Sequence, residues 1–216
     1  MIHGNIFAII SLLFFIVVVM AIFDTGVKRN IVYFAIQSML VIIFGIVFSI
    51  IHHDIYILIA SILGFFSKVI IIPQALFFLQ KRTKTSRDNV KEIVPAINLA
   101  VILGVMVFVY FLTKNIVSDI SNYEVTILIL GLGTFFLGLY MMVIKNNLIA
   151  QITGFLFVEN SISILSITFA SKLPLIIEIG LLLVVLMAVA IMMTLSLSVN
   201  KMFKTLDTQK LTKLKD

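Results

Sequence analysis

One apolar run, residues 148–170, constrains the fold more than any other stretch because it carries a carboxylate near its middle. Crossing a bilayer as a helix takes about 20 mainly apolar residues, so we interpret the run as a membrane-spanning helix. Gln151, Glu159, Ser163 and Ser166 fall on one stripe of such a helix. An ionisable group at mid-bilayer costs about 2.5–3.5 kcal/mol and usually serves a function, which makes Glu159 a candidate functional residue. The alternative, that Glu159 only hydrogen-bonds a neighbouring helix, stays open.

The composition places the whole chain among integral membrane proteins. Hydrophobic residues make up 62% of the 216 residues, and the mean hydropathy is +1.23, whereas soluble domains are about 45–50% apolar. The chain has no cysteine, which excludes disulfides and cysteine-held zinc or iron–sulfur centres. No phosphate loop, nucleophile triad or metal-ligand pattern indicates soluble catalysis, and adjacent His52, His53 and Asp54 on a turn make a poor chelate. The net charge of +6 therefore reports membrane topology rather than nucleic-acid binding.

The apolar runs predict an all-α, polytopic transmembrane bundle of about seven helices. The first run has no basic segment before it and no cleavage site after it, so it is expected to be a helix rather than a signal peptide. We expect one integral membrane domain with a four-helix part over 1–124, a three-helix part over 125–199 and a basic cytoplasmic tail over 200–216. The expected helices cover residues 1–23, 31–51, 55–79, 93–113, 125–144, 148–170 and 175–199.

The lysines and arginines predict the orientation of this bundle. Seven helices place the termini on opposite sides, and loops rich in Lys and Arg stay cytoplasmic. With the C-terminus cytoplasmic and the N-terminus outside, thirteen basic residues lie inside, while Lys114 and Lys172 lie outside and Lys68 lies in the membrane. The inside set is Lys28, Arg29, Lys81, Arg82, Lys84, Arg87, Lys91, Lys145, Lys201, Lys204, Lys210, Lys213 and Lys215.

Lys68 lies near the centre of the third apolar run, roughly 17–20 Å from either end at about 1.5 Å per residue. Its side chain is too short to reach the membrane surface, so we expect it to point into the bundle, toward an acid or trapped water. Pro73 removes a backbone donor and is expected to free a carbonyl near the lysine and to kink the helix. Because Lys68 and Glu159 reach mid-depth from opposite sides, we hypothesise that they face each other.

A pair of this kind suggests a proton relay. A proton arriving at Glu159 would weaken its attraction for Lys68, which is the charge switch that such a relay needs. Glu178 is a third candidate, but it lies in the first turn of the last expected helix, where the helix dipole favours any carboxylate, so a simple interfacial acid remains an alternative. A purely structural ion pair also stays open. The expected supporting polar residues are Gln151, Asn160, Ser163 and Ser166.

Several segments together carry a family resemblance. They are Gly154-Phe-Leu-Phe-Val-Glu159-Asn160, Ser67-Lys68-Val-Ile-Ile-Ile-Pro73 and Leu175-Ile-Ile-Glu178-Ile-Gly180, with residues 33–38, 133–138, 147–154 and 205–214 in support. These segments resemble the membrane component E of hydrogenase-4-type complexes, whose C-terminal part is related to the K subunit of respiratory complex I. One departure is that family members often carry an aspartate six residues after the last-helix glutamate, where this chain has Val184.

The resemblance implies a non-catalytic membrane subunit of a complex I-like [NiFe] hydrogenase or formate hydrogenlyase in the cytoplasmic membrane. It implies antiporter-like membrane subunits and peripheral hydrogenase-type subunits as partners, with nickel–iron and iron–sulfur centres in those partners and no cofactor in this chain. Glu159, Lys68 and Glu178 match the family's buried glutamate, lysine and last-helix glutamate. Two alternatives stay open: a subunit of a cation/proton antiporter or ion-driven bicarbonate-uptake complex, and a structural scaffold.

Overall fold

The computed structural model describes residues 2–83, 95–114 and 121–169, together with 180, 183–185, 187–191 and 194–198. Across these ranges the chain forms helices joined by short turns, and six helical segments are long and apolar enough to cross a membrane. The expected all-α, polytopic membrane fold is therefore confirmed. Of the seventh expected helix, only short helical pieces within 183–198 fall among the described residues, and Glu178 and the tail 200–216 lie outside them.

Seven α-helices and one π-helix account for these spans. α3, η1 and α4 follow one another without a break, so that residues 55–83 form a single long span. The elements are α1 Ile2–Phe23, α2 Val27–His52, α3 Ile55–Gly64, η1 Phe65–Ile71, α4 Ile72–Thr83, α5 Pro95–Thr113, α6 Asn122–Ile144 and α7 Leu148–Phe169.

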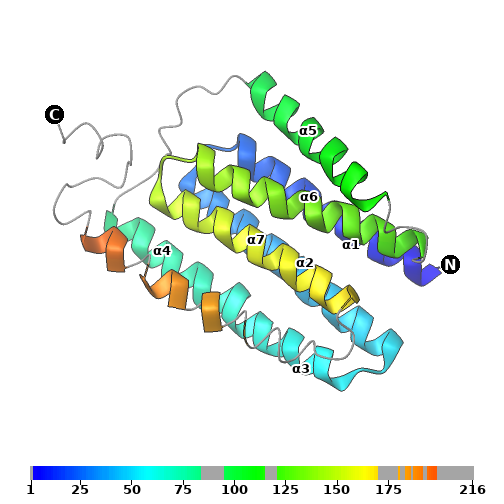
Figure 1. The fold of residues 1–216 in the computed structure, drawn as a ribbon. Helices are drawn as coiled ribbons and strands as arrows, with labels where there is room; N and C mark the ends of the chain where they lie inside the picture. The colour runs from blue at the N-terminus through cyan, green and yellow to red at the C-terminus, as the bar shows by residue number, and fades with distance from the viewer. Residues whose placement is uncertain are drawn as a thin grey trace.

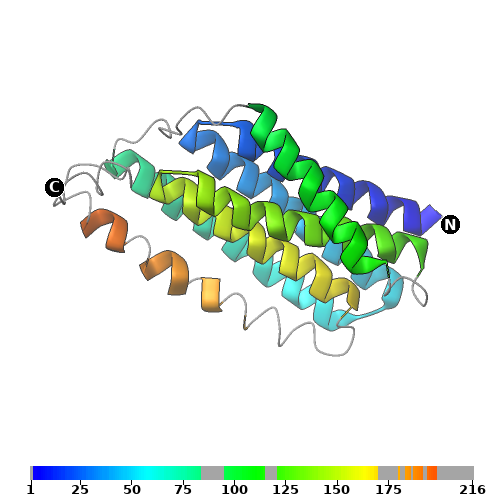
Figure 2. The same cartoon turned by 45° about the horizontal axis from the view of Figure 1, so that its top comes forward.

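α7 lies at the centre of the bundle, packed against α6 on one side and α2 on the other (Figure 1). α1 packs against both α2 and α6, and the long α3–η1–α4 span covers the outer side of α2. α5 lies at the edge and crosses α6 obliquely (Figure 2). It is attached there by the Tyr140 hydroxyl, which donates to Asn98 Oδ1 at 2.8 Å, and by an edge-on contact between Phe108 and Phe136. The central place of α7 explains why most of its residues are buried.

Two apolar cores occupy opposite ends of the bundle. One is built around Phe34, Leu76 and Leu156, and the other around Phe7, Phe44 and Ile164. Many large apolar side chains on the outer faces are exposed, as expected for helices that face lipid. Apolar packing thus accounts for the two ends and the outer surface of the bundle. It does not explain why polar side chains are buried between the two cores.

Helix α2 begins at Val27, four residues earlier than expected, because Asp24 organises the turn before it. The Asp24 carboxylate accepts hydrogen bonds from the Gly26 N–H at 2.7 Å and from the Arg29 guanidinium at 2.6 Å. It also accepts one from the Tyr33 hydroxyl at 3.2 Å. Burial by itself would raise the Asp24 pKa, but the hydrogen bonds from Arg29 and Gly26 outweigh it and hold the pKa below its usual value of 3.8.

This depressed pKa predicts a pH-dependent contribution to stability. A carboxylate with a lowered folded-state pKa stabilises the protein above its unfolded-state pKa and loses that effect as the pH falls through the folded-state pKa. We expect Asp24→Asn to lower the melting temperature near about pH 7. The deficit should shrink as the pH falls below the unfolded-state pKa and through the lowered folded-state pKa of Asp24, and it should be smallest at the lowest pH at which the chain still melts cooperatively. Thermal melts followed by circular dichroism across this range would check it, with exposed Lys28→Gln as the control. A deficit that stays constant as the pH falls would contradict the prediction.

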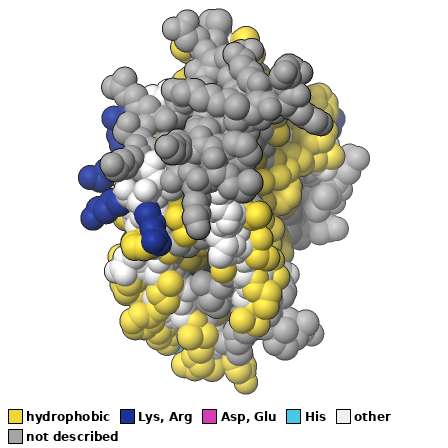
Figure 3. Space-filling model, turned by 90° about the vertical axis from the view of Figure 1, so that its left-hand side faces the viewer, with side chains coloured by type: hydrophobic (Ala, Val, Ile, Leu, Met, Phe, Trp, Pro, Cys, Tyr) yellow, Lys and Arg dark blue, Asp and Glu magenta, His cyan; other side chains and the backbone are white. Residues whose placement is uncertain are grey.

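Exposed basic residues gather at the end of the bundle where α1, α4 and α6 finish (Figure 3). Lys28, Arg29, Lys81 and Arg82 are exposed there, whereas Lys114 lies at the far end of α5. This distribution agrees with a cytoplasmic position for that end, and the orientation of the termini stays a prediction.

Candidate functional site

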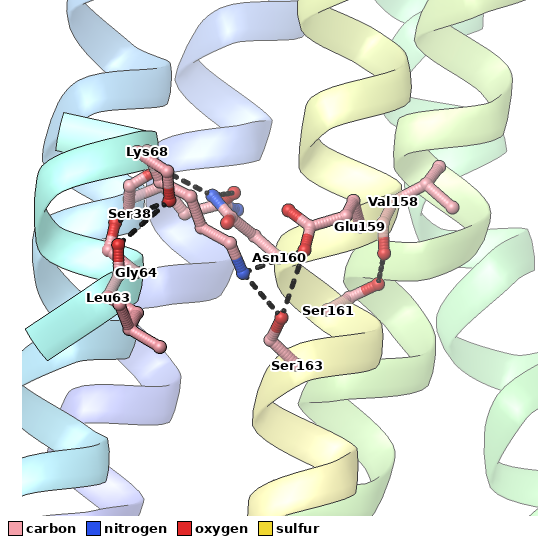
Figure 4. Close-up of polar contacts among 11 residues, drawn as sticks. Ser38, Leu63, Gly64, Lys68, Val158, Glu159, Asn160, Ser161 and Ser163 are labelled. Atoms are coloured by element: carbon pink, nitrogen blue, oxygen red, sulfur yellow. Dashed lines mark hydrogen bonds and ion pairs between the residues drawn. The ribbon is translucent and has the colours of Figure 1, made fainter. Parts of the chain in front are cut away.

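Lys68 and Glu159 point toward one another in the interior of the bundle (Figure 4). The Lys68 Nζ lies 2.7 Å from Glu159 Oε1, and the two side chains are only 1% and 3% exposed. Lys68 comes from η1 and Glu159 from α7, so the pair joins the outer span to the central helix. The hypothesis that the two charges meet directly at mid-depth agrees with this geometry.

Ser163 completes a triangle with the two charges. Its hydroxyl accepts a hydrogen bond from Lys68 Nζ at 2.8 Å and donates one to Glu159 Oε1 at 3.2 Å. Ser163 lies one helical turn after Glu159 on α7, which is the spacing that places both side chains on one face. A hydroxyl that both accepts and donates can pass a proton between neighbouring groups.

The backbone around Lys68 is a π-helix that ends two residues before Pro73. The Ile72 N–H bonds to the Ser67 carbonyl five residues earlier, and the wide turn continues through residues 65–71. Pro73 has no N–H to donate, which removes one of the bonds that would hold a regular α-helical turn here. The Ser67 hydroxyl donates to the Leu63 and Gly64 carbonyls at 3.1 and 3.2 Å. The chain thus accommodates the proline without breaking the span that presents Lys68.

An amide network lies directly beside the ion pair. Asn160 Nδ2 donates to Ser38 Oγ at 3.0 Å and to Gln37 Oε1 at 3.2 Å, and Gln37 Nε2 donates to the Phe14 carbonyl at 3.3 Å. Asn160, Gln37 and Ser38 are fully buried. The network therefore joins α1, α2 and α7 at the depth of Glu159 and limits the rotation of α7 that would turn Glu159 away from Lys68.

Two of the other expected site residues, Gln151 and Ser166, do not join this centre. The Gln151 side chain donates to the Lys145 carbonyl at 2.7 Å, at the turn between α6 and α7. Ser166 lines an apolar groove of about 460 Å³ between α6 and α7 with Phe136 and Leu165. Glu178 lies outside the described residues. Gln151 and Ser166 thus have neighbours other than the ion pair, because successive turns of α7 face different elements, and their supporting role stays a prediction.

Lys145 is a second buried cation that the sequence does not distinguish from an ordinary loop residue. It is 1% exposed, and its Nζ donates to the carbonyls of Ile22 at 3.1 Å and Asp24 at 2.5 Å. These carbonyls end α1, where the helix dipole favours a positive charge. Through these hydrogen bonds Lys145 links the α6–α7 turn to the α1–α2 turn, which is a structural role.

Gln37 and Ser38 are the functional-site residues that sequence reasoning missed. The signal was available, because Gln37 is a polar residue inside an apolar run and both residues belong to a segment that carries the family resemblance. As for metals, the described part of the chain brings together no group of three histidine or acidic side chains that could hold an ion. The Asp54 carboxylate instead accepts the Tyr56 N–H at 2.9 Å and caps α3.

Comparison with known proteins finds relatives that match most of the chain. The chain is 24% identical to hydrogenase-4 component E of Escherichia coli K12 over 183 residues, which cover 85% of each protein. The same values hold for hydrogenase-4 component E of Escherichia coli O157:H7 and of Shigella flexneri. No family model matches the chain, and no solved structure matches it. The expected resemblance to hydrogenase-4 component E is confirmed by this similarity of 24% identity over 85% of the chain.

Proposed function

We propose that this chain is a membrane subunit of a hydrogenase-type complex related to respiratory complex I, in the cytoplasmic membrane, and that the Lys68–Glu159 pair takes part in proton transfer there. Its similarity to hydrogenase-4 component E over 85% of both chains supports the assignment to such a complex. The observation that carries the proton role is the direct 2.7 Å ion pair, almost fully buried between two helices. A buried ion pair often stabilises a protein no more than apolar side chains of similar volume would, because both charges lose their hydration. The presence of this pair therefore favours a functional reason.

The chemistry follows from the charge balance of the pair. While Glu159 is ionised, its carboxylate holds the Lys68 ammonium at 2.7 Å. Protonation of Glu159 removes that attraction, so the ammonium and the Ser163 hydroxyl are released to bind elsewhere. Loss of the proton restores the pair. The amide network of Asn160, Gln37 and Ser38 holds α7 in register during the cycle, since none of its members changes charge near neutral pH.

The partners follow from the same proposal. The chain has no cysteine, so any iron–sulfur or nickel centre would be held by other subunits. We expect antiporter-like membrane subunits beside it and peripheral hydrogenase-type subunits on the cytoplasmic side. Purification of the tagged chain from its own membranes in mild detergent, with mass spectrometry of what accompanies it, tests this. Recovery of cysteine-rich hydrogenase-type subunits is expected. Recovery of antiporter-like subunits without redox proteins would instead assign the chain to an ion-transport complex.

Glu159→Gln tests the proton role within the assembled complex. Glutamine keeps the shape and a hydrogen bond to Ser163 but cannot carry a proton. We expect the variant to assemble and to lose proton translocation by about 10²-fold or more, the scale on which proton-transfer groups act. The measurement is acidification of inverted membrane vesicles, normalised to the amount of assembled complex. Lys81→Gln, which removes a charge at an exposed position on the span that carries Lys68, is the control. Normal translocation by Glu159→Gln would favour the scaffold interpretation.

A further inference from the structure

A groove of about 430 Å³ lies on the outer surface between the end of α1 and the start of α2. This volume falls within the range of about 300–1,000 Å³ that is typical of ligand sites. The groove has an apolar wall on α1 and a polar wall on the α1–α2 turn and the first turns of α2. The walls include Val19, Met20 and Phe23 on the apolar side and Asp24, Arg29 and Tyr33 on the polar side. A single ligand in this groove would therefore meet both kinds of surface.

Arg29 presents a guanidinium that is exposed and yet held in one position. Its side chain is 65% exposed, and its Nε and Nη2 donate to the two carboxylate oxygens of Asp24 at 2.5 and 2.6 Å. A Cβ on Gly26 would lie 3.0 Å from the Arg29 Cζ, so the glycine allows the guanidinium to lie this close to the turn. Among the hydrogen bonds to described residues, none uses Nη1. Arginine has five N–H donors, so this side chain keeps donors for a further acceptor.

The charges at this end of the bundle favour an anionic ligand. Asp24 is the only carboxylate there among the described residues, and each of its oxygens already accepts two hydrogen bonds. Exposed basic side chains gather at the same end (Figure 3), namely Lys28, Lys81 and Arg82 in addition to Arg29. A concentration of positive charge at the surface of a membrane protein attracts anionic groups, including those of lipids.

The apolar wall continues from the groove along the outer face of the bundle. Met20 and Phe23 are exposed in the groove, and Ile16 and Ile36 are exposed about one turn deeper, on α1 and α2 respectively. The α1–α2 turn lies at the ends of two membrane-spanning helices, which is the depth of the lipid head groups. The ligand that fits both walls is therefore amphipathic, with its charge at head-group depth and its apolar part in the bilayer.

We propose that this groove binds an anionic phospholipid, with Arg29 holding the phosphodiester and with Met20 and Phe23 packed against the glycerol and the upper acyl chains. A phosphodiester offers paired oxygens that match the forked donors of a guanidinium, and the edge of the guanidinium that faces away from Asp24 is available for them. The contact with Asp24 also orients the guanidinium beforehand, which lowers the side-chain entropy lost on binding. The inference goes beyond the proposed proton role and does not depend on it.

The chain contains no tryptophan, so a single introduced tryptophan reports on the lipid at its own position. Phe23→Trp places this reporter in the groove. Phe78→Trp is the matched control, because Phe78 is also exposed near the same end and has the Arg82 guanidinium 5.6 Å from its ring centroid, but does not line the groove. The purified full chain is reconstituted in phosphatidylcholine vesicles that contain increasing shares of phosphatidylglycerol with brominated acyl chains. Brominated phosphatidylcholine is the reference, since bromine quenches tryptophan fluorescence on contact.

The quenching curves give the affinity for phosphatidylglycerol relative to phosphatidylcholine at each position, measured at about 0.15 M salt so that distant surface charges are screened. We expect a ratio of at least about fivefold at Phe23→Trp and below about twofold at Phe78→Trp. Adding Arg29→Gln to Phe23→Trp should lower its ratio to that of the control, whereas adding Arg82→Gln should leave it nearly unchanged.

Equal ratios at the two tryptophans would overturn the inference, since they would show attraction to the whole basic end rather than a site in the groove. A ratio at Phe23→Trp that survives Arg29→Gln would overturn the role of the guanidinium. The comparison of the two tryptophans needs no change at Arg29, so it decides the matter also where the Arg29→Gln chain is not recovered folded.

Discussion

Lys68→Met alone is expected to destabilise the folded chain by about 3–5 kcal/mol, the cost of removing one partner from a buried ion pair. Methionine fills much of the lysine's volume, so the loss reflects charge rather than a cavity. The variant withdraws the ammonium from a carboxylate that is 3% exposed and from the Ser163 hydroxyl at 2.8 Å. For a chain of this size the deficit corresponds to a melting temperature lower by about 6–20 °C.

The double variant Lys68→Met with Glu159→Leu tests whether the stability lost in the single variant comes from the unpaired charge that is left behind. Replacing both charges by apolar side chains of similar size leaves no buried charge behind, so we expect it to recover most of the stability that the single variant loses. Melts of the purified chain can be followed by far-ultraviolet circular dichroism, since the protein contains no tryptophan for fluorescence. Lys81→Met, at an exposed position on the same span, controls for loss of a lysine. A double variant as unstable as the single one would show that the pair does not act as a unit.

Gly138→Val is expected to have the second-largest effect, because α6 and α7 cross there without a side chain between them. A Cβ on Gly138 would lie 2.8 Å from Val158 Cγ2 and 3.0 Å from both the Gly154 carbonyl oxygen and the Val158 backbone nitrogen. Two of these three neighbours are backbone atoms, which cannot rotate aside. The helices must therefore separate, and overpacking of this kind costs typically about 1–3 kcal/mol or more.

The bundle supplies a matched control at Gly104 on α5, where an added Cβ meets no atom within 4 Å. Gly104→Val should leave the yield of monodisperse protein and its melting temperature nearly unchanged, whereas Gly138→Val should lower both. Gly154→Val approaches the same crossing from the other helix, with the Met142 backbone nitrogen 3.0 Å away, and should resemble Gly138→Val. Equal behaviour of the Gly138 and Gly104 variants would mean that the close crossing contributes little to stability.

The sequence alone determined the membrane class, the approximate spans and the depth of the two central charges. Apolar run length decides whether a segment can cross a bilayer, and a rise of about 1.5 Å per residue turns a position in that run into a depth. Because Lys68 and Glu159 have nearly the same depth on different helices, a meeting between them could be expected.

The tertiary structure decided which neighbour each face of a helix meets. Gln151 and Ser166 lie on the same stripe of α7 as Glu159, yet one contacts the Lys145 carbonyl and the other an apolar groove, because the helices around α7 cross it at different levels. The partners of Asn160 on α2 depend on the same crossings. The helical repeat orders side chains around one axis, but only the packing of several axes brings residues more than a hundred positions apart into hydrogen-bond distance.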